Sequence, residues 1–399
     1  MSAAIRMQTM QPVLLYGHYE WDQDWLPPDE FEARLSAVRR LMADKGWKGL
    51  VVHGDSQENG LLCYLTSFIP NQRWGLALID MDGPPRLIAP VGSRDLPAVR
   101  KLTWVQDIWA TSDIAGALGT WLREVVDKGG ASIGPGKIGM ANTERMRFDI
   151  AAKALEVCRG FAEVVDASAA LAAITRAKRP REIALLRLSY RCLHMALDEV
   201  ERVRVGGGGD RESLLAGERS ARVAGAQDVR MLCSVDMTGV MRPVNSQSPG
   251  TPRTGQAEPW NVYFALRRGG YWAEALTTMT GVYTPAQRAA RRALEAAAAS
   301  VRAGIACREV FRRMEVDRGP EAGHQLLGVG FCRAGGLSLD GEAWKQADSD
   351  EALVDNGVYT FATGVADGGT GHVQLSTTVL ARGAGHEILW PATAGVRAR

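Results

Sequence analysis

Hydrophobic residues in the first half of the chain recur in some segments at helical spacing and in others as short continuous runs. Over residues 29–46 apolar side chains recur at helical spacing and a glycine follows, which predicts a helix that ends there. Between further amphipathic segments lie short apolar runs that predict strands, at residues 48–54, 74–80 and 85–90. This alternation predicts an α/β domain, to which we assign residues 1–172.

The second half has a different pattern. Pro180 followed by Glu182 predicts the start of a long helix that runs to about residue 205. Residues 261–279 read as an antiparallel hairpin that turns at Arg267-Arg268-Gly269-Gly270. Further strands are predicted near residues 229–235, 357–363 and 373–381, and helices over residues 284–304 and 306–315. We therefore assign residues 173–399 to an α+β domain with antiparallel strands.

The composition excludes several classes of protein. In 399 residues, Lys and Arg number 47 against 45 for Asp and Glu, and the arginines are spread along helices, so no nucleic-acid partner is expected. The six cysteines lack metal-site spacing, which favours reduced thiols in the cytoplasm. The N-terminus lacks the pattern of a signal peptide. No run reaches the roughly 18 apolar residues that a membrane helix needs.

Five segments in order carry a resemblance to a known superfamily. They are RAKRPREIALLRLSYRCLHMAL, RRGGYWAEALTT, EAGHQLLGVGF, DEALVDNGVYTFATGV and GGTGHVQLSTTVLA. The series resembles the creatinase/aminopeptidase P/prolidase/methionine aminopeptidase superfamily. That resemblance implies an α/β N-terminal domain followed by an α+β catalytic-type domain with the pita-bread fold.

The resemblance also implies where metal ligands would stand. Metal-dependent members hold two cations with two aspartates, one histidine and two glutamates. The two aspartate positions fall on Tyr263 and Glu274, and the two glutamate positions on Ala362 and Ser376. The histidine position falls on His324 or, with the LLGVG segment as the matching loop, on Leu327. Because two ligands do not hold a dinuclear site, we expect no metal and no other cofactor.

Creatinase is the metal-free precedent in this superfamily. The segment CRAGGLSL, with Arg333, and the segment FIPNQRWGLALI, with Arg73, are similar to creatinase segments. The resemblance implies a homodimer in which Arg73 reaches the neighbouring subunit's site and, with Arg333, binds a substrate carboxylate. Creatinase's catalytic histidine falls at Gln247 and its active-site glutamate at Ala362, which argues against creatine as the substrate.

The candidate catalytic residues are Glu274, His324 and His372. Glu274 lies on a predicted strand among apolar and aromatic neighbours, where a carboxylate suits general acid–base work. Alternatively, Glu274 is an outward-facing strand residue without a catalytic role. His324 follows a glycine in a loop and His372 precedes the last predicted strand. Each histidine could transfer protons near neutral pH or only bond the backbone.

The candidate substrate-binding residues, besides the arginines, are aromatic or neutral. Tyr263, Tyr271 and Trp272 would form an aromatic wall, although an aromatic stripe is more often part of a core. Gln247 and Ser376 could supply neutral hydrogen bonds. The arginines, in turn, could serve only as surface ion pairs.

These residues favour a cytoplasmic, homodimeric, metal-independent hydrolase. Its substrate would be a small carboxylate-bearing amide, amidine or other C–N compound, processed by general acid–base catalysis. Three alternatives stay open: a C–N or C–C lyase on the same scaffold, a non-catalytic binding protein, and a single metal ion held by Glu274 and His324.

Overall fold

The computed structural model describes residues 19–71, 73–128, 136–234, 241–243, 260–279, 284–316, 326–334, 337, 348–367 and 371–392. The chain folds into two compact units, Met1–Thr175 (unit 1) and Arg176–Arg399 (unit 2). From the sequence we had placed the boundary between residues 172 and 173. No helix among the described residues is long and apolar enough to cross a membrane.

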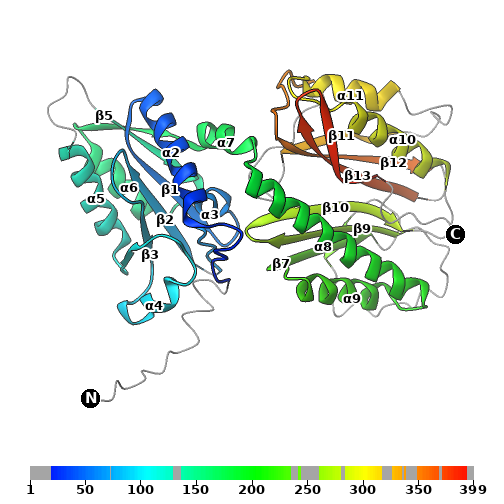
Figure 1. The fold of residues 1–399 in the computed structure, drawn as a ribbon, viewed down its shortest axis with the longest axis horizontal. Helices are drawn as coiled ribbons and strands as arrows, with labels where there is room; N and C mark the ends of the chain where they lie inside the picture. The colour runs from blue at the N-terminus through cyan, green and yellow to red at the C-terminus, as the bar shows by residue number, and fades with distance from the viewer. Residues whose placement is uncertain are drawn as a thin grey trace, which may run out of the picture. The chain divides into compact units, whose positions relative to one another are not determined.

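Unit 1 contains a six-stranded mixed sheet with strand order β4-β3-β2-β1-β5-β6 (Figure 1). Strand β1 pairs antiparallel with β2 and parallel with β5. The strands are β1 Trp47–Asp55, β2 Trp74–Asp80, β3 Arg86–Ala89, β4 Asp107–Ala110, β5 Gly136–Ala141 and β6 Ala162–Asp166. The helices are α2 Pro28–Lys45, α3 Gly60–Thr66, α4 Leu96–Val99, α5 Ile114–Lys128, α6 Phe148–Cys158 and α7 Ser168–Arg176.

The α/β character predicted for the first half follows from burial on both faces of this sheet. Val51 and Ile138 pack with residues of α5 and α6 on one face. On the other face a Cβ on Gly54 would come within 2.7 Å of Leu62 in α3. A sheet covered on both faces needs near-continuous apolar strands, which is why β1 and β2 are buried along almost their whole length.

Unit 2 contains two four-stranded sheets, with strand orders β10-β9-β7-β8 and β11-β12-β13-β14. Helices α8 and α9 lie along the first sheet, and α10 and α11 lie against the second (Figure 1). The strands are β7 Asp228–Ser234, β8 Arg242–Pro243, β9 Trp260–Arg268, β10 Tyr271–Met279, β11 Leu326–Ala334, β12 Val358–Asp367, β13 Gly371–Arg382 and β14 Gly385–Trp390. The helices are α8 Pro180–Val205, α9 Asp210–Val223, α10 Pro285–Ser300 and α11 Cys307–Val316.

The predicted hairpin is confirmed as β9 and β10, but its turn is tighter than predicted. Arg268 pairs with Tyr271, so only Gly269 and Gly270 form the turn. Their φ angles are 56° and 83°, which a two-residue hairpin turn of this kind requires and which glycine adopts without strain. Arg267 and Arg268 therefore belong to strand β9.

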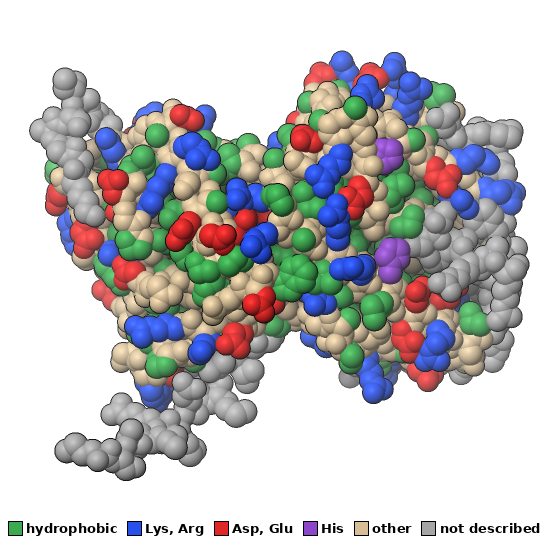
Figure 2. Space-filling model, viewed as in Figure 1, with side chains coloured by type: hydrophobic (Ala, Val, Ile, Leu, Met, Phe, Trp, Pro, Cys, Tyr) green, Lys and Arg blue, Asp and Glu red, His purple; other side chains and the backbone are tan. Residues whose placement is uncertain are grey.

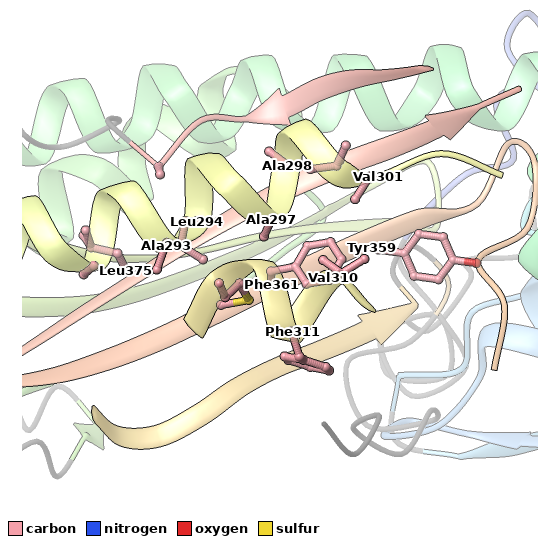
Figure 3. Packing of buried hydrophobic residues seen from close by; sticks show 14 of the residues in the cluster. Ala293, Leu294, Ala297, Ala298, Val301, Val310, Phe311, Tyr359, Phe361 and Leu375 are labelled. Carbon is pink, nitrogen blue, oxygen red and sulfur yellow. The ribbon is translucent and has the colours of Figure 1, made fainter. Parts of the chain in front are cut away.

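One hydrophobic core cluster of unit 2 lies between the α10–α11 pair and the second sheet (Figure 3). Phe361 of β12 meets Phe311 of α11 edge to face, with ring centroids 6.5 Å apart. The alanine-rich helix α10 lies close to the sheet because its small side chains face the strands. Its predicted end at residue 304 is wrong: α10 ends at Ser300, where the backbone becomes extended at Val301.

On the face of the molecule in Figure 2, Lys and Arg side chains are interspersed with Asp and Glu. No single-sign field dominates that view, which agrees with the nearly balanced composition.

Candidate functional site

The candidate site starts from one face of the β9–β10 hairpin. Successive strand residues point to opposite faces, and Glu274 pairs with Ala265 while Leu276 pairs with Tyr263. Tyr263 and Glu274 are thus diagonal neighbours on the same face. The Tyr263 hydroxyl donates a hydrogen bond to Glu274 Oε2 at 2.8 Å. Glu274 is only 6% exposed, so this charge-assisted bond holds a carboxylate that is almost removed from solvent.

Strand β10 is the edge of its sheet, and side chains of the second sheet hold that edge. Ser376 Oγ on β13 accepts a hydrogen bond from the Leu276 N–H at 2.8 Å and donates one to the Leu276 carbonyl at 3.3 Å. Further along, Thr278 Oγ1 accepts from the Gln374 N–H at 2.9 Å. These bonds join the two sheets beside the Tyr263–Glu274 pair.

Tyr190 of α8 adds a third polar group at this junction. Its hydroxyl donates to Thr378 Oγ1 at 3.1 Å, and Thr378 Oγ1 lies 3.0 Å from Thr360 Oγ1. Burial, together with the negative charge of Glu274, raises the pKa of Tyr190 to about 12. Tyr190 therefore stays protonated at neutral pH and keeps its role as a hydrogen-bond donor.

Two arginines that we had not predicted lie on the same face as Glu274. Arg230 of β7 and Arg267 of β9 place their guanidinium carbons 5.0 and 5.1 Å from the centroid of the Trp272 ring. Asp228 Oδ2 lies 3.6 Å from Arg230 and 3.9 Å from Arg267. The sequence signal was present, because Arg230 lies on the strand predicted near residues 229–235 and Asp228 lies two residues before it. Such alternation is equally typical of a solvated strand face.

The structure brings together four of the predicted site residues, namely Tyr263, Trp272, Glu274 and Ser376. Tyr263 and Trp272 form a small apolar cluster with Ala265 on the face that carries Glu274. Ser376 contacts the edge of the same hairpin through Leu276.

Tyr271 is not part of the expected aromatic wall. Neighbouring strand residues face opposite sides, so Tyr271 points away from Trp272 and toward α8. There its hydroxyl donates to Glu182 Oε1 at 3.0 Å.

The remaining predicted residues lie elsewhere or outside the described structure. Arg73 is an exposed residue of unit 1, just before β2. Gln247 and His324 lie outside the described residues. Arg333 belongs to β11 and His372 to β13, but the side chains of both lie outside the described part of the chain. Their predicted roles stay predictions.

The described side chains do not fit a two-metal site. Of the positions at which the resemblance places carboxylate ligands, Ala362 offers no donor atom and the Ser376 hydroxyl is bonded to backbone. The other two positions hold Tyr263, whose hydroxyl donates a hydrogen bond, and Glu274, whose carboxylate accepts it. Divalent cations of this class need several oxygen or nitrogen ligands. Among the described residues, no group of three or more His, Cys, Asp or Glu side chains could hold a metal ion.

Comparisons with known proteins agree with the fold. No model of a protein family matches the sequence, and a search of curated proteins gave no significant match. Solved structures do match. The X-Pro aminopeptidase of Thermotoga maritima has a TM-score of 0.70 at 16% identity, over 92% of this chain and 99% of its own.

Two further structures match over a similar length. A prolidase from Thermococcus sibiricus has a TM-score of 0.72 at 17% identity, over 91% of this chain and 97% of its own. The Xaa-Pro dipeptidase of Bacillus anthracis has a TM-score of 0.67 at 15% identity, over 92% and 99%. The chain therefore has the pita-bread fold of these aminopeptidases and prolidases, with an α/β unit before it.

Proposed function

We propose that the chain is a hydrolase that uses its pita-bread domain without a bound metal ion. Its substrate would be a small amide, amidine or related C–N compound that carries a carboxylate. One observation carries the proposal: two positions that the resemblance assigns to metal ligands hold instead the hydrogen-bonded pair Tyr263 and Glu274. The similarity in fold to peptidases supports hydrolysis as the reaction type.

The pair suits proton transfer. Glu274 accepts a proton from a water molecule while the water oxygen attacks the substrate carbon. The same carboxyl group then delivers the proton to the leaving nitrogen as the C–N bond breaks. Tyr263 positions the carboxylate by its hydrogen bond, so that Glu274 keeps one orientation during both steps. His324 and His372 remain the sequence's candidates for a second proton carrier.

The Glu274→Gln substitution tests this proposal directly. Glutamine has nearly the same shape and can still accept the Tyr263 hydrogen bond, but it cannot take up a proton. With EDTA present throughout, a panel of small amides, guanidino acids and cyclic imino acids is screened for turnover. We expect kcat of the variant to fall by at least about a hundredfold on any active compound.

The matched control is Glu295→Gln on α10, whose half-exposed side chain pairs with Arg291. It should leave kcat unchanged. Near-normal turnover by Glu274→Gln removes the mechanism. Tight binding of a panel member without any turnover would identify the chain as a binding protein instead.

A further inference from the structure

The cluster formed by Arg230, Arg267, Trp272 and Asp228 has no part in the proton chemistry of Glu274. We propose that Arg230, assisted by Arg267, binds the carboxylate of the substrate beside the indole of Trp272. This inference rests on the proposed function for the reaction but assigns the anion-binding residues independently. From the sequence we had expected Arg73 and Arg333 in that role.

Strand register places the cluster next to Glu274. Arg230 pairs with Ala265, which pairs in turn with Glu274, so these three residues form one row across the sheet. Asp228, Arg267 and Trp272 form the adjacent row on the same face. Paired strands lie about 4.8 Å apart and alternate residues of a strand about 7 Å apart. A molecule only a few bonds long therefore spans from the arginines to the Glu274 carboxylate.

The two arginines of the cluster supply the donors for an anion. Two guanidinium groups lie near one carboxylate, Asp228, and the Glu274 carboxylate lies in the adjacent row. Asp228 lies 3.6 and 3.9 Å from the two arginines, beyond hydrogen-bond length, so it does not form a tight fork with either. The Arg267 side chain is only 7% exposed, which strengthens its electrostatic effect on a bound anion.

Arg230 is the residue placed to make the direct contact. Its side chain is 40% exposed, so a small solute can reach it. Stacking on an aromatic ring uses the face of a guanidinium, whereas its N–H donors lie in the plane and match the two oxygens of a carboxylate. The Trp272 ring, 5.0 Å from the guanidinium carbon of Arg230, leaves these in-plane donors available to a carboxylate.

A purely structural role would give a different pattern. Arg267 lies directly opposite Asp228 and Trp272, as expected of cross-strand pairs that stabilise a sheet. On the β9 side Arg230 lies opposite Ala265, which is no charged or aromatic partner. Removal of the Arg230 charge should therefore affect anion binding more than folding.

The test compares two probes that differ only in their end group, the carboxylate of N-acetylglycine and the neutral carboxamide of N-acetylglycinamide. Their affinities for the full chain are measured by isothermal titration calorimetry with EDTA present. We expect the carboxylate to bind at least about tenfold more tightly than the amide, as a charge-assisted fork implies. Arg230→Gln should abolish that preference, and Arg230→Lys, which keeps the charge but not the fork, should retain part of it.

The control variants separate this inference from the proposed reaction. Arg202→Gln on α8, where the side chain is 69% exposed, should keep the full preference. Glu274→Gln should also keep it, even though turnover is lost. Equal binding of the two probes by the unaltered chain overturns the inference, as does a preference that survives Arg230→Gln with thermal stability unchanged. Carboxylate preference through Arg230 without turnover of any compound would instead overturn the proposed function alone.

Discussion

Ser376 offers a quantitative test of how the two sheets of unit 2 are held together. Its hydroxyl makes two hydrogen bonds to the backbone of Leu276, and the residue is only 2% exposed. In Ser376→Ala the N–H and carbonyl of Leu276 lose these partners. Leaving such groups unsatisfied costs about 1–3 kcal/mol. With two bonds removed, we expect about 2 kcal/mol, which lowers the melting temperature of a unit this size by about 4–8 °C.

The assay combines thermal unfolding with amide hydrogen exchange. Exchange at the Leu276 amide should become faster in Ser376→Ala, because the variant removes the acceptor of that N–H. The control is Ser300→Ala, whose hydroxyl donates only to the Ala297 carbonyl at the end of α10. That variant should change the free energy of unfolding by less than about 0.5 kcal/mol. Unchanged stability together with unchanged Leu276 exchange would refute the assignment of Ser376 as a connector between the sheets.

Three further outcomes follow from the structure. Phe361→Ala should lower the free energy of unfolding of unit 2 by about 3–5 kcal/mol in denaturant titrations, because it empties a fully buried ring site; Ile388→Ala, at a 48% exposed position, should cost far less. Burial lowers the pKa of His53. The charge of Asp55 opposes this shift and the charge of Arg145 adds to it. Unit 1 should therefore lose stability as pH falls below about 6.5. The melting temperature of His53→Leu should fall less between pH 7 and pH 5. In Tyr190→Phe, loss of the bond to Thr378 should cost about 1 kcal/mol, and exchange at the Glu274 amide, which bonds to the Tyr190 hydroxyl, should become faster.

The protonation of the His53 imidazole sets this pH dependence. Above pH 6.5 the imidazole is neutral in both the folded and the unfolded chain, so its contribution to stability is complete. As pH falls below 6.5 the unfolded chain binds a proton that the folded chain resists. Stability then declines until the lowered folded-state pKa is reached.

The hairpin shows what the sequence was able to predict. Two alternating apolar runs around Arg267-Arg268-Gly269-Gly270 predict an antiparallel hairpin, and the structure narrows the turn to the two glycines. The structure confirms the hairpin because local turn chemistry and strand period agree. The same period-two rule would have separated Tyr271 from Trp272, so their predicted common wall contradicts a signal that was already in the sequence.

Other features depended on tertiary pairing. Strands β11 and β14 were not predicted, because glycine-rich or half-exposed segments become strands only beside β12 and β13. Arg230 and Arg267 gained a role only when the register of β7 against β9 placed both beside Trp272. Nor does the sequence show that Ser376 bonds to Leu276, since those residues come from different sheets.

In the described part of unit 2, three of the four positions to which the resemblance assigns carboxylate ligands carry a phenol, a hydroxyl or no donor atom, and the fourth carries Glu274. Tyr263 donates to Glu274, Ser376 holds the edge of β10, and Ala362 contributes no donor. We propose proton transfer by the positioned Glu274 carboxylate as the chemistry of this arrangement.

The divalent-metal content of the purified full chain tests this account most directly. The protein is incubated with excess Mn²⁺ or Zn²⁺, desalted and analysed by elemental mass spectrometry, and turnover of any active compound is followed with and without EDTA. The account predicts far less than one ion per chain after desalting and the same rate with or without chelator. About two retained ions per chain, with turnover that EDTA abolishes and Mn²⁺ restores, would contradict it.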